Sequence, residues 1–474
     1  MNNPKKNYIY NIIYQVLILI IPLIISPYLS RIIGAEGIGI YSYTYSIVNY
    51  FMLLTLLGVN NYGNRAIAKV RDNKDKLTKT FWSIYSLQLV MGCIMLIIYI
   101  VYVLLFDNKF KTVALIQSLF IVSAMLDINW LFFGLEEFKK TITRNSFVKI
   151  ANVILILLLI KNKDDVYKYA LIMSSMTCLS QLILWRFVRK KISFVKLKFK
   201  DVKEHIKPNL ILFIPVIAIS LYKIMDKIML GMITNVSEVG YYENAEKIIG
   251  IPLSLILALG TVMLPRMSNL IAKGDNESAK KYISKSIDFV MFLSLPMCAG
   301  LIGVSYHFAP LFFGIEFQKT GIVMMLLATT LPILSFANVL RTQYLIPKEK
   351  DKIYIKSVFG GAITNLIMNF IFIPKYGSIG ACIGTISAEF AVMFYQALSI
   401  RKELPIKEYV AKIIPYFIKA LIMLAIIYPF NYIHINSVLR LLIQIGLGCM
   451  IYGLINIKYL LSIIDLKKIL KKKS

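Results

Sequence analysis

The segment YIYNIIYQVLILIIPLIISPYLSRIIGAEGIGIYSYTYSI, residues 8–47, indicates the fold class. Its part 8–33 is a run of about 25 residues with one charge, Arg31, which is long enough to cross a hydrocarbon core of about 30 Å. Pro22 lies inside this run, where a proline is tolerated if neighbouring helices or water satisfy the freed carbonyl group. The glycine-rich turn 34–39 predicts that the chain then reverses. We therefore expect two consecutive transmembrane helices.

The composition extends this expectation to the whole chain. The 474 residues are 58% hydrophobic with a mean hydropathy of +0.69, which leaves too little polar surface for a soluble domain. The apolar runs predict an all-α integral membrane protein with about 14 transmembrane helices. The predicted spans are 8–33, 39–60, 81–106, 112–134, 146–161, 166–186, 208–233, 240–264, 287–307, 320–340, 354–374, 379–400, 413–432 and 437–457.

The distribution of positive charge gives the orientation of these spans. The chain has 54 Lys and Arg against 25 Asp and Glu, a net charge of +29. Positive charge stays cytoplasmic in short loops, and most of it falls on one side of the map if both termini are cytoplasmic. The densest clusters, 186–207 and 467–473, fit this topology and an attraction to anionic membrane lipids. No binding of nucleic acid is expected.

The sequence contains no signature of catalysis. Its five cysteines lie in apolar runs without CxxC spacing, and its three histidines are scattered, so we expect neither a disulfide nor a metal site. No phosphate-binding loop of the GxxxxGK type occurs. The longest outer connection has roughly a dozen residues, which is short for the catalytic segment of a polymerase or glycosyltransferase. We therefore expect a transporter without a cofactor.

The chain repeats itself. With Gly39 set against Gly240, GIYSYTYSI aligns with GYYENAEKI, and later NWLFFGLEEFKK and TQYLIPKEKDK both end an even-numbered span in a charged turn. We infer two six-helix lobes, residues 1–200 and 201–402, related as a parallel pseudo-two-fold repeat, and two additional helices with a basic tail in 403–474. Transporters built this way bind substrate where the lobes meet and rock one lobe against the other.

Charged residues within spans point to a polar site. A Lys, Arg or Asp at mid-span is unfavourable by about 2.5–3.5 kcal/mol, so such residues should face protein or water. In the seventh span Lys223, Asp226 and Lys227 share one helical face, and Lys223 and Asp226 have the i,i+3 spacing of a pair. They are candidates for a cavity. Alternatively, the pair is structural and Lys227 extends its ammonium group to the membrane surface.

The repeat places other polar residues in equivalent positions. Glu246 and Lys247 of the eighth span align with Tyr45 and its neighbour in the second span, which is followed by Asn49. Aromatic and amide groups suit a sugar, although a tyrosine near a span end is also a common interfacial anchor.

Three further groups complete the candidates. Asp127 and Trp130 lie on a polar line of the fourth span, and Asn338 lies beside Arg341 at the end of the tenth span. Arg31 could bind a phosphate through two parallel hydrogen bonds, or it could cap its own helix at the headgroups.

The motifs PYLSRIIGAEGIGIYSYTYSI and GVNNYGNRAIAKVRD, with the doubled lobes, resemble the bacterial polysaccharide-repeat flippases, the Wzx-type members of the MOP superfamily. The resemblance implies alternating-access transport of undecaprenyl-diphosphate-linked oligosaccharide across the cytoplasmic membrane, for capsule, O-antigen or exopolysaccharide synthesis. It also implies a cationic cavity between the lobes, a role placed here on Arg31, Lys223, Lys227, Lys247 and Arg341.

The resemblance leaves several properties open. A lipid II flippase or a cation-coupled multidrug antiporter is the alternative within the superfamily. A proton or sodium gradient could drive the cycle through Asp127, Asp226 or Glu246. We expect a monomer that works with a polysaccharide polymerase and chain-length machinery.

Overall fold

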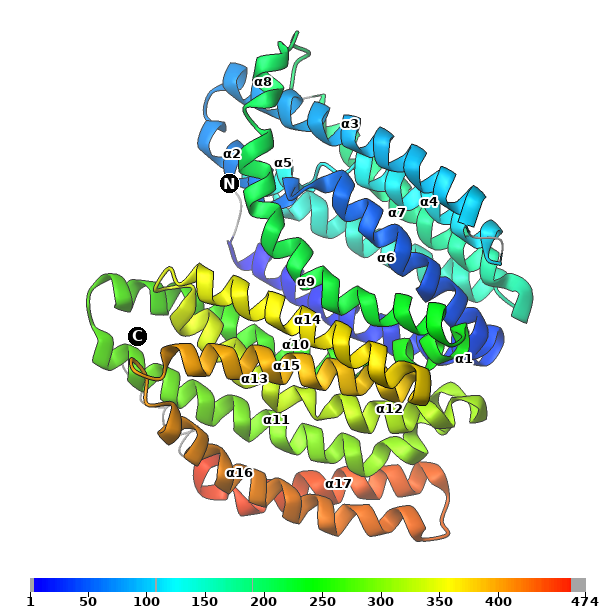
Figure 1. Cartoon of the computed structure of the whole chain (residues 1–474), viewed down its shortest axis with the longest axis vertical. Coiled ribbons are helices and arrows are strands. Elements are labelled where there is room, and N and C mark those ends of the chain that lie inside the picture. The colour runs from blue at the N-terminus through cyan, green and yellow to red at the C-terminus, as the bar shows by residue number, and fades with distance from the viewer. Residues whose placement is uncertain (1–3, 107–108, 190, 462–474) are drawn as a thin grey trace. The chain divides into compact units, whose positions relative to one another are not determined.

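The computed structural model describes residues 4–106, 109–189 and 191–461, without the side chains of residues 4–19, 138, 215, 218 and 221–223. This described part is helical throughout, with no β-strand (Figure 1). Twelve of its helical segments are long and apolar enough to cross a membrane. The predicted all-α membrane fold is therefore confirmed.

The exact number of spans stays a prediction. The segment Ile20–Val70 counts as one of the twelve, but its first helix, α1 (Pro4–Leu56), is broken at Gly34, where φ is 69° and ψ is −178°. Glycine tolerates this positive φ, which other residues rarely adopt. The ribbon of α1 crosses its unit and returns (Figure 1), as the glycine-rich turn predicts. The 28-residue helix α9 (Ile206–Ile233) is not among the twelve, because some of its side chains are not described.

The chain divides into two compact units, Met1–Glu243 and Asn244–Ser474, called here the N-terminal and C-terminal units. The boundary falls inside α10 (Val236–Ala272), because α9 packs against α1 and is grouped with it. The predicted division at residue 200, and a groove between lobes, stay predictions. The other helices of the N-terminal unit are α2 (Val59–Val70), α3 (Lys74–Phe106), α4 (Lys111–Met125), α5 (Asn129–Gly134), α6 (Phe138–Leu159), η1 (Lys163–Asp165), α7 (Val166–Val188) and α8 (Phe199–Lys203).

The C-terminal unit is organised around the 38-residue helix α11, against which α12, α13, α16 and α17 pack. The pair α14 and α15 lies side by side, and α13 and α12 contact α15. The helices are α11 (Asn276–Phe313), η2 (Ile315–Phe317), α12 (Gln318–Ala328), α13 (Thr330–Leu340), η3 (Arg341–Leu345), α14 (Asp351–Tyr376), α15 (Ser378–Ile400), α16 (Ile406–Ile427), η4 (Tyr428–Tyr432) and α17 (Ser437–Ile455).

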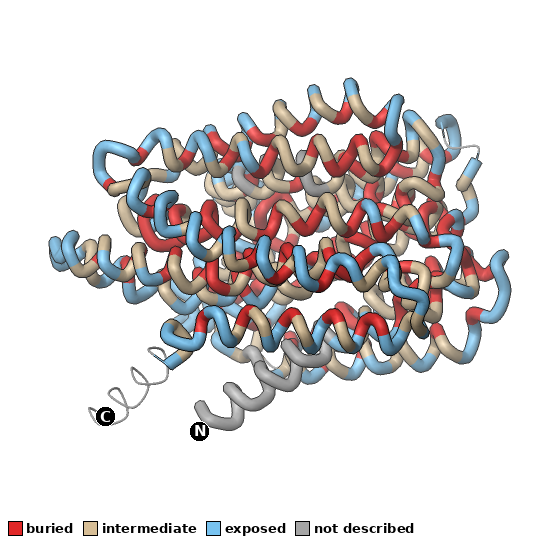
Figure 2. The backbone as a smooth tube through the Cα atoms, turned by 90° about the horizontal axis from the view of Figure 1, so that it is seen from below, coloured by how far each residue is buried: buried red, intermediate tan, exposed pale blue. Residues whose placement is uncertain are grey.

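Burial alternates along these helices with a helical period, as Figure 2 shows. One side of α3 is buried, whereas Val90, Ile97 and Leu105 on its other side are exposed. An apolar exposed side is expected for a helix that faces lipid. The buried side of α3 packs Phe81 against Trp130, with ring centroids 5.4 Å apart.

A reciprocal contact between equivalent parts of the repeat fixes the start of α10 on α1. A Cβ atom built on Gly39 would lie 1.7 Å from the carbonyl oxygen of Val236, and one built on Gly240 would lie 2.1 Å from that of Ala35. The two glycines are the ones that the repeat aligns, and each contacts the residue four positions before the other. The two backbones therefore touch, as at glycine-mediated helix crossings in membranes.

The repeat also recurs in the turns after α5 and η3. Glu136 and Glu349 both have a positive φ, 59° and 55°. In both turns the next residue donates its N–H to a carbonyl five positions earlier, from Glu137 to Phe132 and from Lys350 to Leu345. The two turns therefore share one backbone conformation, which supports the predicted repeat.

Replacement of Gly240 by alanine tests the reciprocal contact. The added methyl group meets backbone atoms that cannot rotate away, so Gly240→Ala should lower the stability of the protein by about 1–3 kcal/mol. The thermal unfolding midpoint in detergent is the measurement. Gly250→Ala in the same helix is the control, because nothing lies within 4 Å of its added Cβ atom. Equal midpoints for the two variants would contradict the contact.

Candidate functional site

Two polar pairs join α9 to the start of α10 in the N-terminal unit. Lys227 Nζ lies 2.8 Å from Glu243 Oε2, with the two side chains 17% and 16% exposed. One residue earlier on each helix, the Tyr242 hydroxyl donates to Asp226 Oδ2 at 2.9 Å, and both residues are buried. A charge in a membrane interior needs such partners, since an unpaired one is strongly unfavourable. The pairs therefore keep four polar side chains at this position.

Tyrosines of α1 and α7 surround the ion pair. Tyr41 and Tyr45 are one helical turn apart on α1, and their rings stack at 5.8 Å. The ring of Tyr169 lies 4.4 Å from that of Tyr41. Lys227 and Glu243 are close enough to Tyr45 to interact with it electrostatically. We call these five residues the tyrosine–lysine cluster.

The structure thus brings together three of the residues that the sequence analysis names, Tyr45, Asp226 and Lys227. Glu243 opens the charged face of the eighth span in the sequence, but sequence reasoning does not name it as a site residue, and it misses Tyr41, Tyr169 and Tyr242 as members of the site. The i,i+4 spacing of Tyr41 and Tyr45 is visible in the sequence. Tyr169 carries no comparable signal, because it comes from a helix far away along the chain.

The other candidates of these helices are Lys223, Arg31, Asn49, Glu246 and Lys247. The side chain of Lys223 is outside the described part, so its predicted pairing with Asp226 stays a prediction. Arg31 is exposed, and Asn49 is half-buried on α1. Glu246 and Lys247 are half-buried on α10, in the part of this helix that belongs to the C-terminal unit.

The sequence predicts that Asp127 and Trp130 lie on one face of a single helix. That prediction is wrong, because the helix is interrupted between them. Residues 126–128 separate α4 from α5, because the side chains of Gln88, Trp130 and Trp185 take carbonyl groups that a helix would use, Trp185 that of Leu126 at 3.0 Å. Gln88 Nε2 donates to the carbonyls of Ala124 and Asp127 at 2.7 and 2.8 Å. The indole of Trp130 also donates to the carbonyl of Asp127, at 3.1 Å, and Trp130 is fully buried. Trp130 is thus a core residue that stabilises the helix break.

A buried arginine that sequence reasoning misses lies beside this break. Arg144 is 6% exposed and donates to Asn129 Oδ1 at 2.9 Å and to Gln181 Oε1 at 3.1 Å. Asn129 in turn donates through Nδ2 to Asp127 Oδ1 at 2.7 Å. One amide therefore bridges the half-buried Asp127 carboxylate and the buried guanidinium group.

Asn338 and Arg341 come together in the C-terminal unit. Arg341 Nη2 donates to Asn338 Oδ1 at 2.6 Å, and the guanidinium carbon lies 5.7 Å from the centre of the Tyr354 ring. Arg341 begins η3, a π-helix, and such turns are frequent at functional sites. The buried Nδ2 of Asn338 has no hydrogen-bond partner among the described atoms. A hydrogen-bond donor, Asn338 Nδ2, and a cation, the guanidinium group of Arg341, therefore lie side by side.

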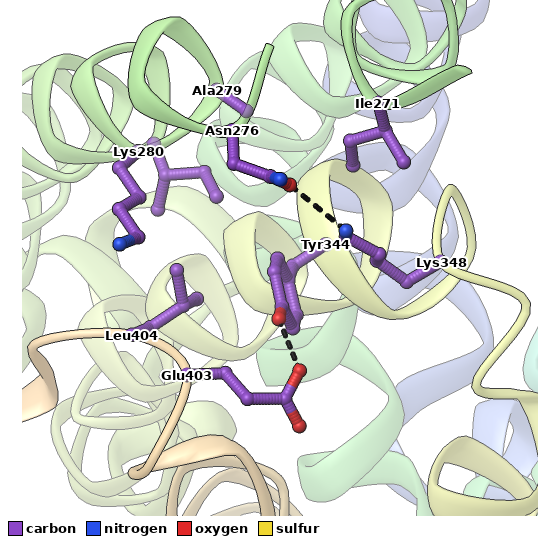
Figure 3. A pocket seen from close by; sticks show the side chains of 9 residues that line it. Ile271, Asn276, Ala279, Lys280, Tyr344, Lys348, Glu403 and Leu404 are labelled. Atoms are coloured by element: carbon purple, nitrogen blue, oxygen red, sulfur yellow. Dashed lines mark hydrogen bonds between the residues drawn. The ribbon is translucent and has the colours of Figure 1, made fainter. Parts of the chain in front are cut away.

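A pocket of about 250 Å³ lies near η3 (Figure 3). The Tyr344 hydroxyl donates to Glu403, and Lys348 Nζ donates to Asn276 Oδ1 at 2.9 Å. Lys350 also forms an ion pair with Glu403. The bonds to Glu403 tie η3 and the turn after it to the connection that follows α15, and the bond to Asn276 ties the same turn to the start of α11.

The N-terminal unit contains the same tie with the charges exchanged. Glu137 follows α5 and forms ion pairs with Lys191, three residues beyond α7, at 2.5 Å and with Lys140 at 2.8 Å. Burial raises the pKa of Glu137, but the two ammonium groups outweigh burial and hold the pKa below its usual value. The pKa of Glu403 is likewise held low, by the Lys350 ammonium group and the Tyr344 hydroxyl.

Among the described residues no group of three or more His, Cys, Asp or Glu could hold a metal ion.

Comparisons with known proteins bear on the chain as a whole. Residues 5–271 match the family model described as "Polysaccharide biosynthesis protein". The "Putative O-antigen transporter" of Escherichia coli K12 is 24% identical over 410 residues, which are 84% of this chain and 96% of the relative. The "Probable low-salt glycan biosynthesis flippase" of Haloferax volcanii is 24% identical over 292 residues, 61% of each chain.

A solved structure supports the fold. The lipid II flippase MurJ in an inward closed conformation is similar with a TM-score of 0.80 over 96% of this chain and 100% of that chain. The sequences are 16% identical, so the likeness concerns the fold alone.

The tie at Glu403 predicts a pH-dependent stability. Because the folded state holds the pKa of Glu403 low, its stabilising effect is complete above the unfolded pKa of about 4.3 and is lost as the pH falls through the lower folded pKa. Glu403→Gln should lower the unfolding temperature at pH 7, and the difference from the parent should shrink below about pH 4. Glu408→Gln, at an exposed position nearby, is the control. A difference that does not vary with pH would contradict the prediction.

Proposed function

Because the chain belongs to the polysaccharide biosynthesis protein family, we propose that it is a flippase for undecaprenyl-diphosphate-linked oligosaccharide repeat units. The proposal is supported by relatives that are named as an O-antigen transporter and a glycan biosynthesis flippase. Transport proceeds by alternating access, and the product serves the synthesis of capsule, O-antigen or exopolysaccharide. The chain acts as a transporter and catalyses no reaction.

The observation that carries the proposal is the tyrosine–lysine cluster. A pyrophosphate that crosses hydrocarbon unaided loses its hydration, which is very unfavourable for a charged group. Lys227 supplies a positive charge inside a membrane-spanning helix bundle, and Glu243 keeps that charge stable when no substrate is bound. A bound phosphate replaces Glu243 as the partner of Lys227, so the cation is paired in both states.

The tyrosines suit the sugar part of the same substrate. Tyr41, Tyr45 and Tyr169 present aromatic rings and hydroxyl groups beside the ion pair. Aromatic faces pack on the apolar faces of sugar rings, while hydroxyl groups bind their polar edges. In the C-terminal unit Arg341 and the unused donor of Asn338 offer a second site for an anion or a hydroxyl group.

The proposed site keeps all the candidate residues of the sequence. They are Arg31, Tyr45, Asn49, Asp127, Trp130, Lys223, Asp226, Lys227, Glu246, Lys247, Asn338 and Arg341. Trp130 acts by holding the helix break beside Asp127 rather than by touching substrate.

We further propose that the protein lies in the bacterial cytoplasmic membrane with both termini in the cytoplasm. The excess of basic residues in the predicted cytoplasmic connections supports this orientation. The protein acts as a monomer, contacts anionic lipids and delivers its product to a polymerase with its chain-length machinery. A proton or sodium gradient drives the cycle through Asp127, Asp226 or Glu246, since these are acidic residues that lie in or beside its spans and belong to the candidate site.

Charge exchange at the ion pair tests the proposed function. Lys227→Gln should reduce leaflet transfer of a labelled lipid-linked repeat unit in vesicles by about tenfold or more, because the phosphate loses its cation. The double variant Lys227→Glu/Glu243→Lys keeps an ion pair and should keep the unfolding temperature, while transfer stays low because the cation has moved to α10.

The control variant is Lys109→Gln, outside the cluster. Full transfer by Lys227→Gln would remove this lysine from the site. Rescue of peptidoglycan synthesis in cells depleted of their own lipid II flippase, without transfer of the oligosaccharide, would favour the alternative substrate, lipid II.

A further inference from the structure

The connection between α7 and α9 exposes two phenylalanines among lysines. Residues 191–200, KISFVKLKFK, are called here the anchor segment. Phe194 is 83% exposed and Phe199 is 80% exposed. Lys196, Lys198 and Lys200 are exposed as well. Large aromatic side chains are seldom left so open to water, and their exposure often marks a binding surface.

Exposure alternates along this segment. Phe194, Lys196 and Lys198 are exposed, whereas Val195 and Leu197 between them are half-buried. This period of two is typical of an extended chain that lies on a surface with one face outward. The outward face therefore carries both an aromatic ring and ammonium groups.

Three contacts fix the anchor segment and the residue that follows it to α3. The indole of Trp82 donates to the carbonyl of Ser193 at 2.8 Å, and its ring meets that of Phe194 edge-on at 5.7 Å. Just beyond the segment, Asp201 forms an ion pair with Lys79 of α3 at 2.9 Å. The segment is thus held in place at both ends, and its exposed side chains have a defined direction.

The surrounding tryptophans indicate the depth of the segment in a membrane. Trp82 lies two turns into α3, Trp185 lies one turn from the end of α7, and their rings are 6.5 Å apart. Both helices are candidate membrane spans. Tryptophan is enriched at the level of the lipid headgroups, so the anchor segment adjoins this level.

We propose that the anchor segment binds the surface of an anionic lipid bilayer. Phe194 and Phe199 insert at the boundary between headgroups and acyl chains, and Lys196, Lys198 and Lys200 bind the phosphates of anionic lipids. Aromatic insertion together with basic charge is the combination that holds a surface segment on such a membrane. Charge complementarity selects the lipid surface as the occupant. The contact fixes the depth of the N-terminal unit and does not depend on the transported substrate.

Fluorescence quenching tests the proposal on the full-length protein. Phe194→Trp is reconstituted in phosphatidylcholine vesicles with or without phosphatidylglycerol, using lipids brominated close to the headgroup. The fluorescence of the variant in excess of the parent protein comes from the new indole at position 194. The brominated lipids should quench this excess fluorescence in the anionic vesicles. The triple variant Lys196→Gln/Lys198→Gln/Lys200→Gln in this background should lose that quenching, because about three headgroup contacts disappear.

A second triple variant, Lys273→Gln/Lys281→Gln/Lys285→Gln, removes the same charge from exposed positions just after α10 and in the first three turns of α11, and quenching should persist. Added emission that is unquenched in both kinds of vesicle would overturn the proposal. Equal quenching with and without phosphatidylglycerol would overturn the role of anionic lipids.

Discussion

The close approach of two backbones, at Gly39 and at Gly240, is the constraint on which the candidate site depends. Each glycine lies against a carbonyl group of the other helix, so any side chain at either position would separate α1 from α10. This contact places Tyr242 and Glu243 at the start of α10 where they meet α9. It also holds that end of α10 against the helix that carries Tyr45. Without this backbone contact, the ion pair of Lys227 and Glu243 would not lie beside the tyrosines of α1.

The internal repeat conserves geometry more strictly than chemistry. The turn after α5 and the turn after η3 share a positive φ at a glutamate, and each is tied to the connection after the sixth helix of its repeat. The tie is Glu137 with Lys191 in one unit and Lys350 with Glu403 in the other, with the charges exchanged. An ion pair stabilises equally well in either direction. The repeat therefore keeps the pair while each partner changes sign.

Charged side chains within the helix bundle of the N-terminal unit follow one rule. Lys227, Asp226 and Arg144 all have polar partners in the described part of the chain, and these partners are carboxylate, hydroxyl and amide groups. Arg144 donates to the amide groups of Asn129 and Gln181, whereas Lys227 pairs with the carboxylate of Glu243. A transported anion can replace a carboxylate, so the lysine is the better candidate for contact with substrate. The arginine stabilises the break between α4 and α5 instead.

The sequence by itself determined the membrane class, the repeat and the turn at Gly34, because hydrophobicity, charge bias and glycine spacing act locally along the chain. It also named Asp226 and Lys227, since a charge inside an apolar run needs a partner. Only the tertiary structure decided which residues pair with Asp226 and Lys227. Tyr242, Glu243 and Tyr169 reach the cluster through packing between helices, and helical phase within one segment does not contain that information. For the same reason Trp130 proved to be a core residue, because Gln88, distant in sequence, breaks the helix on which its predicted position relied.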